Sequence, residues 1–224
     1  MNRNVLFVAP HPDDETLGCG GVIQKHKEDG DRIYWLIITK AYEEDGFDRA
    51  RIEEREHEIR SVAQQYGFER TFRLDLRTVA LDTYPLKDVV SAVGKVIRET
   101  EASILYLPND SDVHSDHAVV FNASWSCCKS FRYPLVKEVY VYETLSETEF
   151  AAPYAHKGFH PNTFVDITPY LDRKNAILNV FKSEVGDHPF PRSTENVAAL
   201  ATLRGAQIGV RYAEAFVCLK RVIA

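Results

Sequence analysis

Short β-rich runs alternate with longer stretches of helical spacing along this chain. The runs Val5–Ala9 and Arg32–Thr39 lack a polar alternation, which predicts strands buried on both faces, as in a parallel sheet. From about Asp48 to Tyr66, apolar residues recur at helical spacing until Gly67. Repeated strand–helix alternation predicts parallel strands with right-handed crossovers. We therefore expect an α/β, Rossmann-like fold with a mostly parallel sheet flanked by helices.

The rest of the chain continues this pattern, with a less regular last third. Further strands are expected at Arg70–Leu76, Ser103–Leu107, Glu138–Glu143, Phe164–Ile167 and Ala215–Val222. Further helices are expected at Glu15–Lys27, around Leu86–Ile97, after Ser115, at Leu171–Lys182 and at Glu195–Ala206. No internal repeat, low-complexity tract or clear linker interrupts the sequence. Residues 1–224 are therefore predicted to form a single domain.

The net charge argues against some classes of partner, and the cysteines indicate the location of the chain. Lys plus Arg is 27 and Asp plus Glu is 33, giving a net charge of −6, which argues against nucleic acid or an anionic membrane surface as partner. No apolar stretch reaches the roughly 18–20 residues of a membrane span. The four cysteines form no C-x-x-C pair, so reduced thiols and a cytoplasmic location are expected. A small-molecule substrate is favoured, and a homo-oligomer is possible.

Two polar clusters follow predicted strands. The first strand leads into the sequence PHPDDE at 10–15, and the fourth leads into NDSDVHSDH at 109–117. Ligands of open α/β sheets bind beyond the carboxyl ends of the strands. Acidic residues here could simply favour the positive end of the following helix, but a histidine adds nothing to such a cap. We therefore expect the two clusters to form one functional site.

The spacing within the clusters is suited to a metal. His11 and Asp14 are three residues apart, and so are His114 and His117, which can place each pair on one face of a turn or helix start. Three ligands drawn from these four residues would leave one coordination position of Zn²⁺ for water. The remaining residues, including Asp13, could supply acid–base chemistry and orient the ligands.

The glycines after the first cluster have two interpretations. Gly18, Gly20 and Gly21 weakly suggest a dinucleotide-binding loop. However, they lie inside a helix-like segment behind an acidic run that would repel a pyrophosphate. Close packing of a helix on the sheet is the interpretation we favour.

At these residues the chain resembles a known family. The sequence APHPDDE at 9–15, followed by HSDH at 114–117, is similar to the LmbE-like, or PIG-L-like, zinc N-deacetylases. The segment from Arg204 to Phe216 also looks like the closing segment of that family. The resemblance implies a Rossmann-like hydrolase that removes the acetyl group from an N-acetylglucosamine-type sugar.

The same resemblance implies roles for individual residues. His11, Asp14 and His117 would hold Zn²⁺, with Fe²⁺ as the possible alternative. Asp13 would be the general base. His114 would face the reacting carbonyl in protonated form, with Asp116 orienting it and raising its pKa. Two residues before His114, where some members have a tyrosine, this chain has Asp112.

Three further residues are candidates for substrate binding. Arg55 lies on the apolar stripe of its helix and matches an Arg-x-x-Glu that contacts sugar hydroxyls in the family. The alternative for Arg55 is a structural ion pair with Glu56 or Glu58. His188 and Arg192 lie in a proline-rich segment, which is either a functional loop or only a structural one.

Other functions use similar residues. The nearest is an amidase that cleaves a larger N-acyl group from a sugar or thiol conjugate. Asp and His clusters also hold the two metals of phosphoesterases. A carbohydrate-binding protein without turnover is the non-enzymatic alternative.

Overall fold

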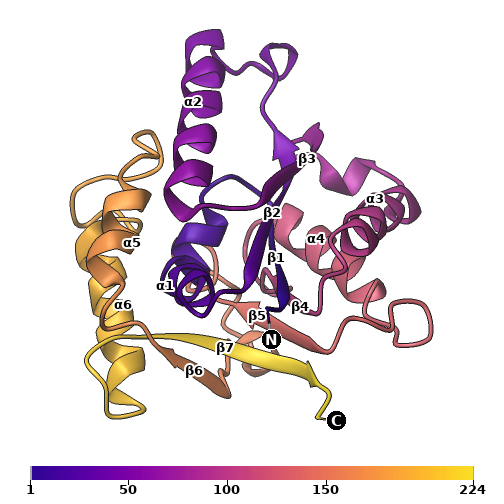
Figure 1. Ribbon diagram of the computed structural model, residues 1–224. Helices are drawn as coiled ribbons and strands as arrows, with labels where there is room; N and C mark the ends of the chain where they lie inside the picture. The colour runs from indigo at the N-terminus through magenta and orange to yellow at the C-terminus, as the bar shows by residue number, and fades with distance from the viewer. Residues whose placement is uncertain (1, 224) are drawn as a thin grey trace.

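The computed structural model describes residues 2–223, and within them seven strands form one mixed sheet with helices on both faces (Figure 1). The strands are β1 (Asn4–Ala9), β2 (Arg32–Lys40), β3 (Arg70–Arg77), β4 (Ile104–Leu107), β5 (Glu138–Tyr142), β6 (Thr163–Asp166) and β7 (Ala213–Arg221). The helices are α1 (Asp14–Glu28), α2 (Arg49–Tyr66), α3 (Leu86–Glu99), α4 (Ser115–Ser126), α5 (Leu171–Leu178) and α6 (Thr194–Ala206). Short 3₁₀ helices lie at Glu43–Asp45, Leu81–Thr83 and Ala155–Lys157.

The strand order is β3-β2-β1-β4-β5-β7-β6. β1 pairs in parallel with β2 and β4, and the parallel pairing continues outward to β3 and β5. β7 runs antiparallel between β5 and β6. The expected Rossmann-like α/β fold is therefore confirmed. The antiparallel direction of β7 was not predicted, because crossover rules do not constrain a strand that follows an irregular segment.

Each face of the sheet is covered by its own hydrophobic core. Phe7 of β1 and Trp35 of β2 face the core built with α1, α2, α5 and α6. Leu6 and Leu36 face the opposite core, built with α3 and α4. Figure 1 shows these two groups of helices on opposite sides of the sheet. Burial on both faces explains why the first two strands are apolar without interruption.

Local sequence signals set the ends of α2. The Asp48 carboxylate accepts the N–H groups of Ala50 and Arg51, and such an N-cap contributes about 1 kcal/mol. Gly67 ends the helix at φ 69°, a conformation that glycine adopts without strain. None of the helices within residues 2–223 has both the length and the apolar composition needed to cross a membrane.

Helix α1 packs unusually close to its neighbours. A methyl group at Gly18 would collide with the ring of Tyr142, and one at Gly21 would collide with Ile167. The interpretation of these glycines as residues of close packing is therefore confirmed. This close approach fixes the position of the helix whose first turn carries Asp14.

A buried ion pair is hydrogen-bonded to the backbone of α1. Lys174 of α5 and Glu214 of β7 are only 4% and 5% exposed, and Nζ lies 2.7 Å from Oε1. Lys174 Nζ donates to the Leu17 carbonyl at 2.8 Å, and Glu214 accepts the N–H groups of Gly21 and Val22 at 2.8 Å each. An α-helix normally pairs the N–H of residue 21 with the carbonyl of residue 17. The Lys174–Glu214 pair thus bonds both the carbonyl and the N–H that an α-helix normally joins to each other.

We predict that Glu214→Gln destabilises the protein by about 3 kcal/mol, because it leaves a buried lysine without its counter-ion. The free energy of unfolding is measured by denaturant titration. Glu54→Gln, a change of the same chemistry at an exposed position of α2, is the control and is expected to change stability by less than about 0.5 kcal/mol. Equal stability of the two variants would contradict this role for Glu214.

Candidate active site

Two loops at adjacent strand ends supply the polar residues of the site. His11 and Asp13 lie between β1 and α1, and Asp14 begins α1. His114 precedes α4, and His117 lies in its first turn. Because β1 and β4 are parallel neighbours, their carboxyl ends meet at one edge of the sheet. The structure thus brings together the two clusters that the sequence predicted to converge.

Three imidazole rings and one carboxylate form the centre of the site. The ring centroid of His11 lies 4.4 Å from that of His114 and 5.5 Å from that of His117, and the centroids of His114 and His117 lie 5.7 Å apart. Asp14 Oδ2 lies 3.4 Å from His11 Nδ1 and 3.4 Å from His117 Nε2. Two ligands of a tetrahedral zinc ion, each bound at about 2.0–2.1 Å, are separated by about 3.4 Å. The spacing therefore fits a cation among these three atoms.

The environment of His117 also fits a metal ligand. Its Nε2 is buried and has no hydrogen-bond partner within residues 2–223. Its Nδ1 is hydrogen-bonded to Asp112 Oδ2 at 2.8 Å, and the other oxygen of Asp112 accepts from Asn109 and Thr148. A carboxylate on one nitrogen commonly orients the other nitrogen toward a metal. The sequence reasoning missed this role of Asp112, although a carboxylate five residues before a candidate ligand was an available signal.

The Asp116 side chain is hydrogen-bonded to His11, not to His114. Oδ2 lies 3.1 Å from His11 Nε2 and accepts the N–H of Val79 at 2.8 Å, while Oδ1 accepts the N–H of Leu81 at 3.2 Å. The prediction that this carboxylate orients His114 is therefore wrong. A second donor group of His11, His114 and Asp116 is also close enough for a metal. Both oxygens of Asp116 accept backbone hydrogen bonds, whereas Asp14 accepts one, from the His11 N–H to Oδ2 at 2.8 Å, so we favour the group that contains Asp14.

His114 is positioned by the backbone. Its Nδ1 accepts the N–H of Asp116 at 3.1 Å, at the start of α4. Burial, together with the nearby charges of His11 and His117, lowers the pKa of His114 to about 4. The charge of Asp116 raises this pKa, as expected, but burial and the two imidazoles outweigh it, so the net shift is opposite to the expected one and favours a neutral ring. A neutral ring whose Nδ1 accepts carries its proton on Nε2, so His114 remains a hydrogen-bond donor.

Opposite charges hold the centre together. Burial alone would raise the pKa of the Asp14 carboxyl, but His117 and His11 outweigh it and hold that pKa well below its usual range. Burial alone would lower the pKa of His11, whereas its bonds to Asp116 and Asp14 raise that pKa to about 9. The carboxylates therefore favour positive charge at the imidazoles, whether a proton or a cation supplies it.

Asp13 has a strained backbone and a carboxyl group at the pocket. Its φ of 146° is rare for a residue other than glycine. Its N–H donates to Glu15 Oε2 at 3.1 Å, and its carbonyl accepts the N–H groups of Thr16 and Leu17. Burial, together with the charge of Asp14, raises the pKa of Asp13 to about 7. A carboxyl group with such a pKa can both accept and return a proton near neutrality.

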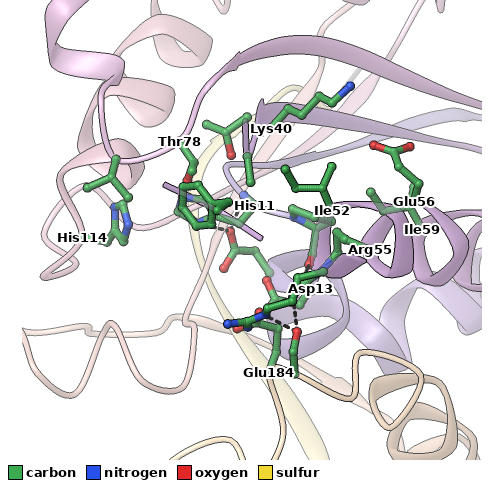
Figure 2. A pocket seen from close by; sticks show the side chains of 18 of the residues that line it. His11, Asp13, Lys40, Ile52, Arg55, Glu56, Ile59, Thr78, His114 and Glu184 are labelled. Carbon is green, nitrogen blue, oxygen red and sulfur yellow. Dashed lines mark hydrogen bonds and ion pairs between the residues drawn. The ribbon is translucent and has the colours of Figure 1, made fainter. Parts of the chain in front are cut away.

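A cavity of about 270 Å³ opens beside these residues. Its walls include the end of β2 at 39–41 and the first half of α2. Figure 2 shows His114 and His11 on one side of the cavity and Arg55 and Glu56 of α2 on the other, with Asp13 between them. A substrate in this cavity would therefore contact the histidine cluster and α2 together.

Arg55 and Arg192 line the cavity and share one carboxylate. Arg55 Nη1 donates to the Pro12 carbonyl at 2.7 Å, Nε lies 3.1 Å from Glu58 Oε2, and Nη2 pairs with Glu184. Arg192 Nη2 bonds the other oxygen of Glu184 at 3.0 Å. Of the alternatives for Arg55, the ion pair with Glu58 is present, and the guanidinium also reaches the cavity wall. Glu184 was missed because its partner on α2 is remote in sequence.

His188 does not reach the cavity. It is exposed and is absent from the residues that line the cavity. The Arg192 guanidinium bonds both the carbonyl and the carboxylate of Glu184, which ties together the two ends of the segment that contains His188. The lining of the cavity thus gives no support to His188 as a substrate-binding residue, and that role stays a prediction.

Comparisons with known proteins agree with the motif. Residues 6–128 match the model of the PIG-L family, described as GlcNAc-PI de-N-acetylase. The "Uncharacterized deacetylase YaiS" of Escherichia coli (strain K12) is 27% identical over 81% of this chain and 91% of its own length. The "Diacetylchitobiose deacetylase" of Thermococcus kodakarensis is 25% identical over 95% of this chain and 81% of its own. The conserved protein TT1542 from Thermus thermophilus has a similar fold, with a TM-score of 0.78, 23% identity, and coverage of 99% of this chain and 97% of its own.

We predict that Asp116→Asn destabilises the protein by about 1–3 kcal/mol, because an amide NH₂ would face a donor where a carboxylate oxygen now accepts. Thermal and denaturant unfolding measure the change. Asp110→Asn, in the same loop but exposed, is the matched control and is expected to behave like the wild type. A fully stable Asp116→Asn protein would rule out this function of the carboxylate.

Proposed function

This chain belongs to the PIG-L family, and from that premise we propose that it is a metal-dependent hydrolase that removes the N-acetyl group from an N-acetylglucosamine-type sugar or sugar conjugate. The main support is the carboxylate oxygen of Asp14, which lies 3.4 Å from nitrogens of both His11 and His117 beside a cavity. The deacetylase names of the two curated relatives agree with this proposal.

His11, Asp14 and His117 are the proposed metal ligands. The buried Nε2 of His117, which has no hydrogen-bond partner within the described residues and lies 3.4 Å from Asp14 Oδ2, supports this assignment. A bound zinc ion polarises a carbonyl oxygen and lowers the pKa of a bound water to about 7. Fe²⁺ is an alternative, because ligands of this kind do not by themselves select one divalent metal. Asp112 and Asp116 are positioning residues, since each is hydrogen-bonded to the second nitrogen of one ligand.

Asp13 is the proposed general base. It is adjacent to Asp14, and its carboxyl group lines the cavity. In the proposed reaction Asp13 takes a proton from the attacking water while a C–O bond forms at the amide carbon. The C–N bond then breaks, and the same proton passes to the leaving nitrogen. The products are acetic acid and the free amine, and near neutral pH the acid ionises to acetate as the amine takes up a proton.

His114 is the proposed donor to the reacting oxygen. Because its Nδ1 accepts a backbone hydrogen bond, the neutral ring donates from Nε2. One donor of this kind typically contributes about 3–4 kcal/mol to the stabilisation of the transition state. Arg55 and Arg192 are proposed to contact the sugar hydroxyl groups from the other side of the cavity.

The direct test is release of acetate from a panel of N-acetylated sugars, with and without a chelator. We expect acetate release that the chelator abolishes and that added Zn²⁺ or Fe²⁺ restores. In His117→Ala we expect loss of both bound metal and activity, whereas His57→Ala, at an exposed position of α2, should keep both. Elemental analysis gives the metal content. A stoichiometric metal in His117→Ala would refute the ligand set.

We predict that Asp13→Asn retains the metal and loses about 10²–10⁴-fold in kcat, because an amide cannot accept the proton from water. Asp172→Asn, at an exposed position of α5, is the control and should be fully active. Acetate release and metal content are measured on the same preparations. Normal turnover in Asp13→Asn would remove the general-base assignment, whatever the metal content.

A further inference from the structure

Val79 lies in the segment between β3 and the short helix Leu81–Thr83, and its backbone is strained. Its φ is 60°, in the left-handed region, where a β-branched residue is a genuine outlier. Such strain persists only where the surroundings hold it, and it often occurs at functional sites. Val79 is also 65% exposed and lines the cavity beside His11 and His114.

The strained conformation is held by the residue that positions His11. Asp116 Oδ2 accepts the Val79 N–H at 2.8 Å and is bonded to His11 Nε2 at 3.1 Å, so one oxygen joins the strained residue to the proposed metal ligand. Asp116 Oδ1 accepts the N–H of Leu81, whose side chain is fully buried and anchors the segment. The backbone of Val79 is therefore fixed next to the ring of His11.

Fold stability does not explain a valine at this position. Its side chain belongs to neither hydrophobic core, and a glycine would adopt the same φ without strain. Val79 instead contributes an apolar residue to the lining of the cavity that also includes His11 and His114.

The chemistry of the two sides of the cavity orients an amide substrate. The leaving nitrogen must lie near Asp13, and Arg55, whose Nη1 binds the neighbouring Pro12 carbonyl, offers a polar surface for a sugar there. The reacting oxygen lies toward His114. The acyl chain must point away from the nitrogen, and toward the side of His11 and His114 it would meet Val79, one of two exposed apolar residues that line the cavity; the other, Phe47, precedes α2.

We propose that Val79 is a specificity-determining residue that limits the acyl group to acetyl by closing this side of the cavity. The proposal rests on the deacetylase function proposed above. Removing the side chain would make room for a longer acyl chain, and pocket contacts of one or two methylenes change selectivity by about 10–200-fold.

The test compares N-acetyl-, N-propionyl- and N-butyrylglucosamine as substrates of the wild type and Val79→Gly. We expect the ratio of kcat/KM for butyryl over acetyl to rise at least about tenfold in Val79→Gly. Because glycine relieves the strain, we also expect its Tm to equal or exceed that of the wild type. An unchanged ratio in a folded, active Val79→Gly enzyme would overturn the proposal.

Two further variants separate the effect of side-chain size at residue 79 from the effect of relieved backbone strain. Val79→Asn keeps a side chain of similar size and tolerates the left-handed conformation, so its substrate ratio should stay near that of the wild type. Glu101→Gly relieves a positive φ of 49° at an exposed residue outside the cavity, so it should raise Tm without changing the ratio. A ratio that rises equally in all three variants would overturn the size limit. Absence of acyl release by the wild type would instead overturn the proposed function itself.

Discussion

A carboxylate buried between two imidazole rings is the interaction on which the candidate site depends. Asp14 is 3% exposed, and a desolvated carboxylate requires compensating positive charge. His11 and His117 supply it, and each is held on its second nitrogen by a further carboxylate, from Asp116 and Asp112. Three carboxylates around two imidazoles create a strongly negative centre. Such a centre attracts a divalent cation, and the same ring of hydrogen bonds fixes the geometry of its ligands.

The strained residues of the site are held by acids from the same two loops. Asp13, with φ 146°, donates its N–H to Glu15, and Val79, with φ 60°, donates its N–H to Asp116. In both cases a buried carboxylate accepts from the backbone of a residue that lines the cavity. Asp13 lies in the loop after β1 and Val79 in the segment after β3, and these two acids fix the backbone of both residues at the border of the cavity.

The parts of the site that were predictable from the sequence follow from topology. Adjacent parallel strands bring their terminal loops together, so the convergence of the clusters needs no knowledge of side-chain packing. The predictions that failed concern the directions of side chains, and the residues that were missed have partners distant in sequence. Asp116 was assigned to His114 because they are two residues apart, but side chains at that spacing diverge at the start of a helix. Glu184, 129 residues from Arg55, carries no local signal of its partner.

The Lys174–Glu214 pair has a consequence for the boundaries of the functional unit. The family match ends at residue 128, yet the helix that begins with Asp14 is bonded through its own backbone to two residues far beyond that point. A fragment ending at 128 would leave the Leu17 carbonyl and the Gly21 N–H without these partners in an apolar setting. The smallest portion of this chain that can be excised with an intact centre therefore extends to β7, and chimeras between relatives must exchange both charged partners together.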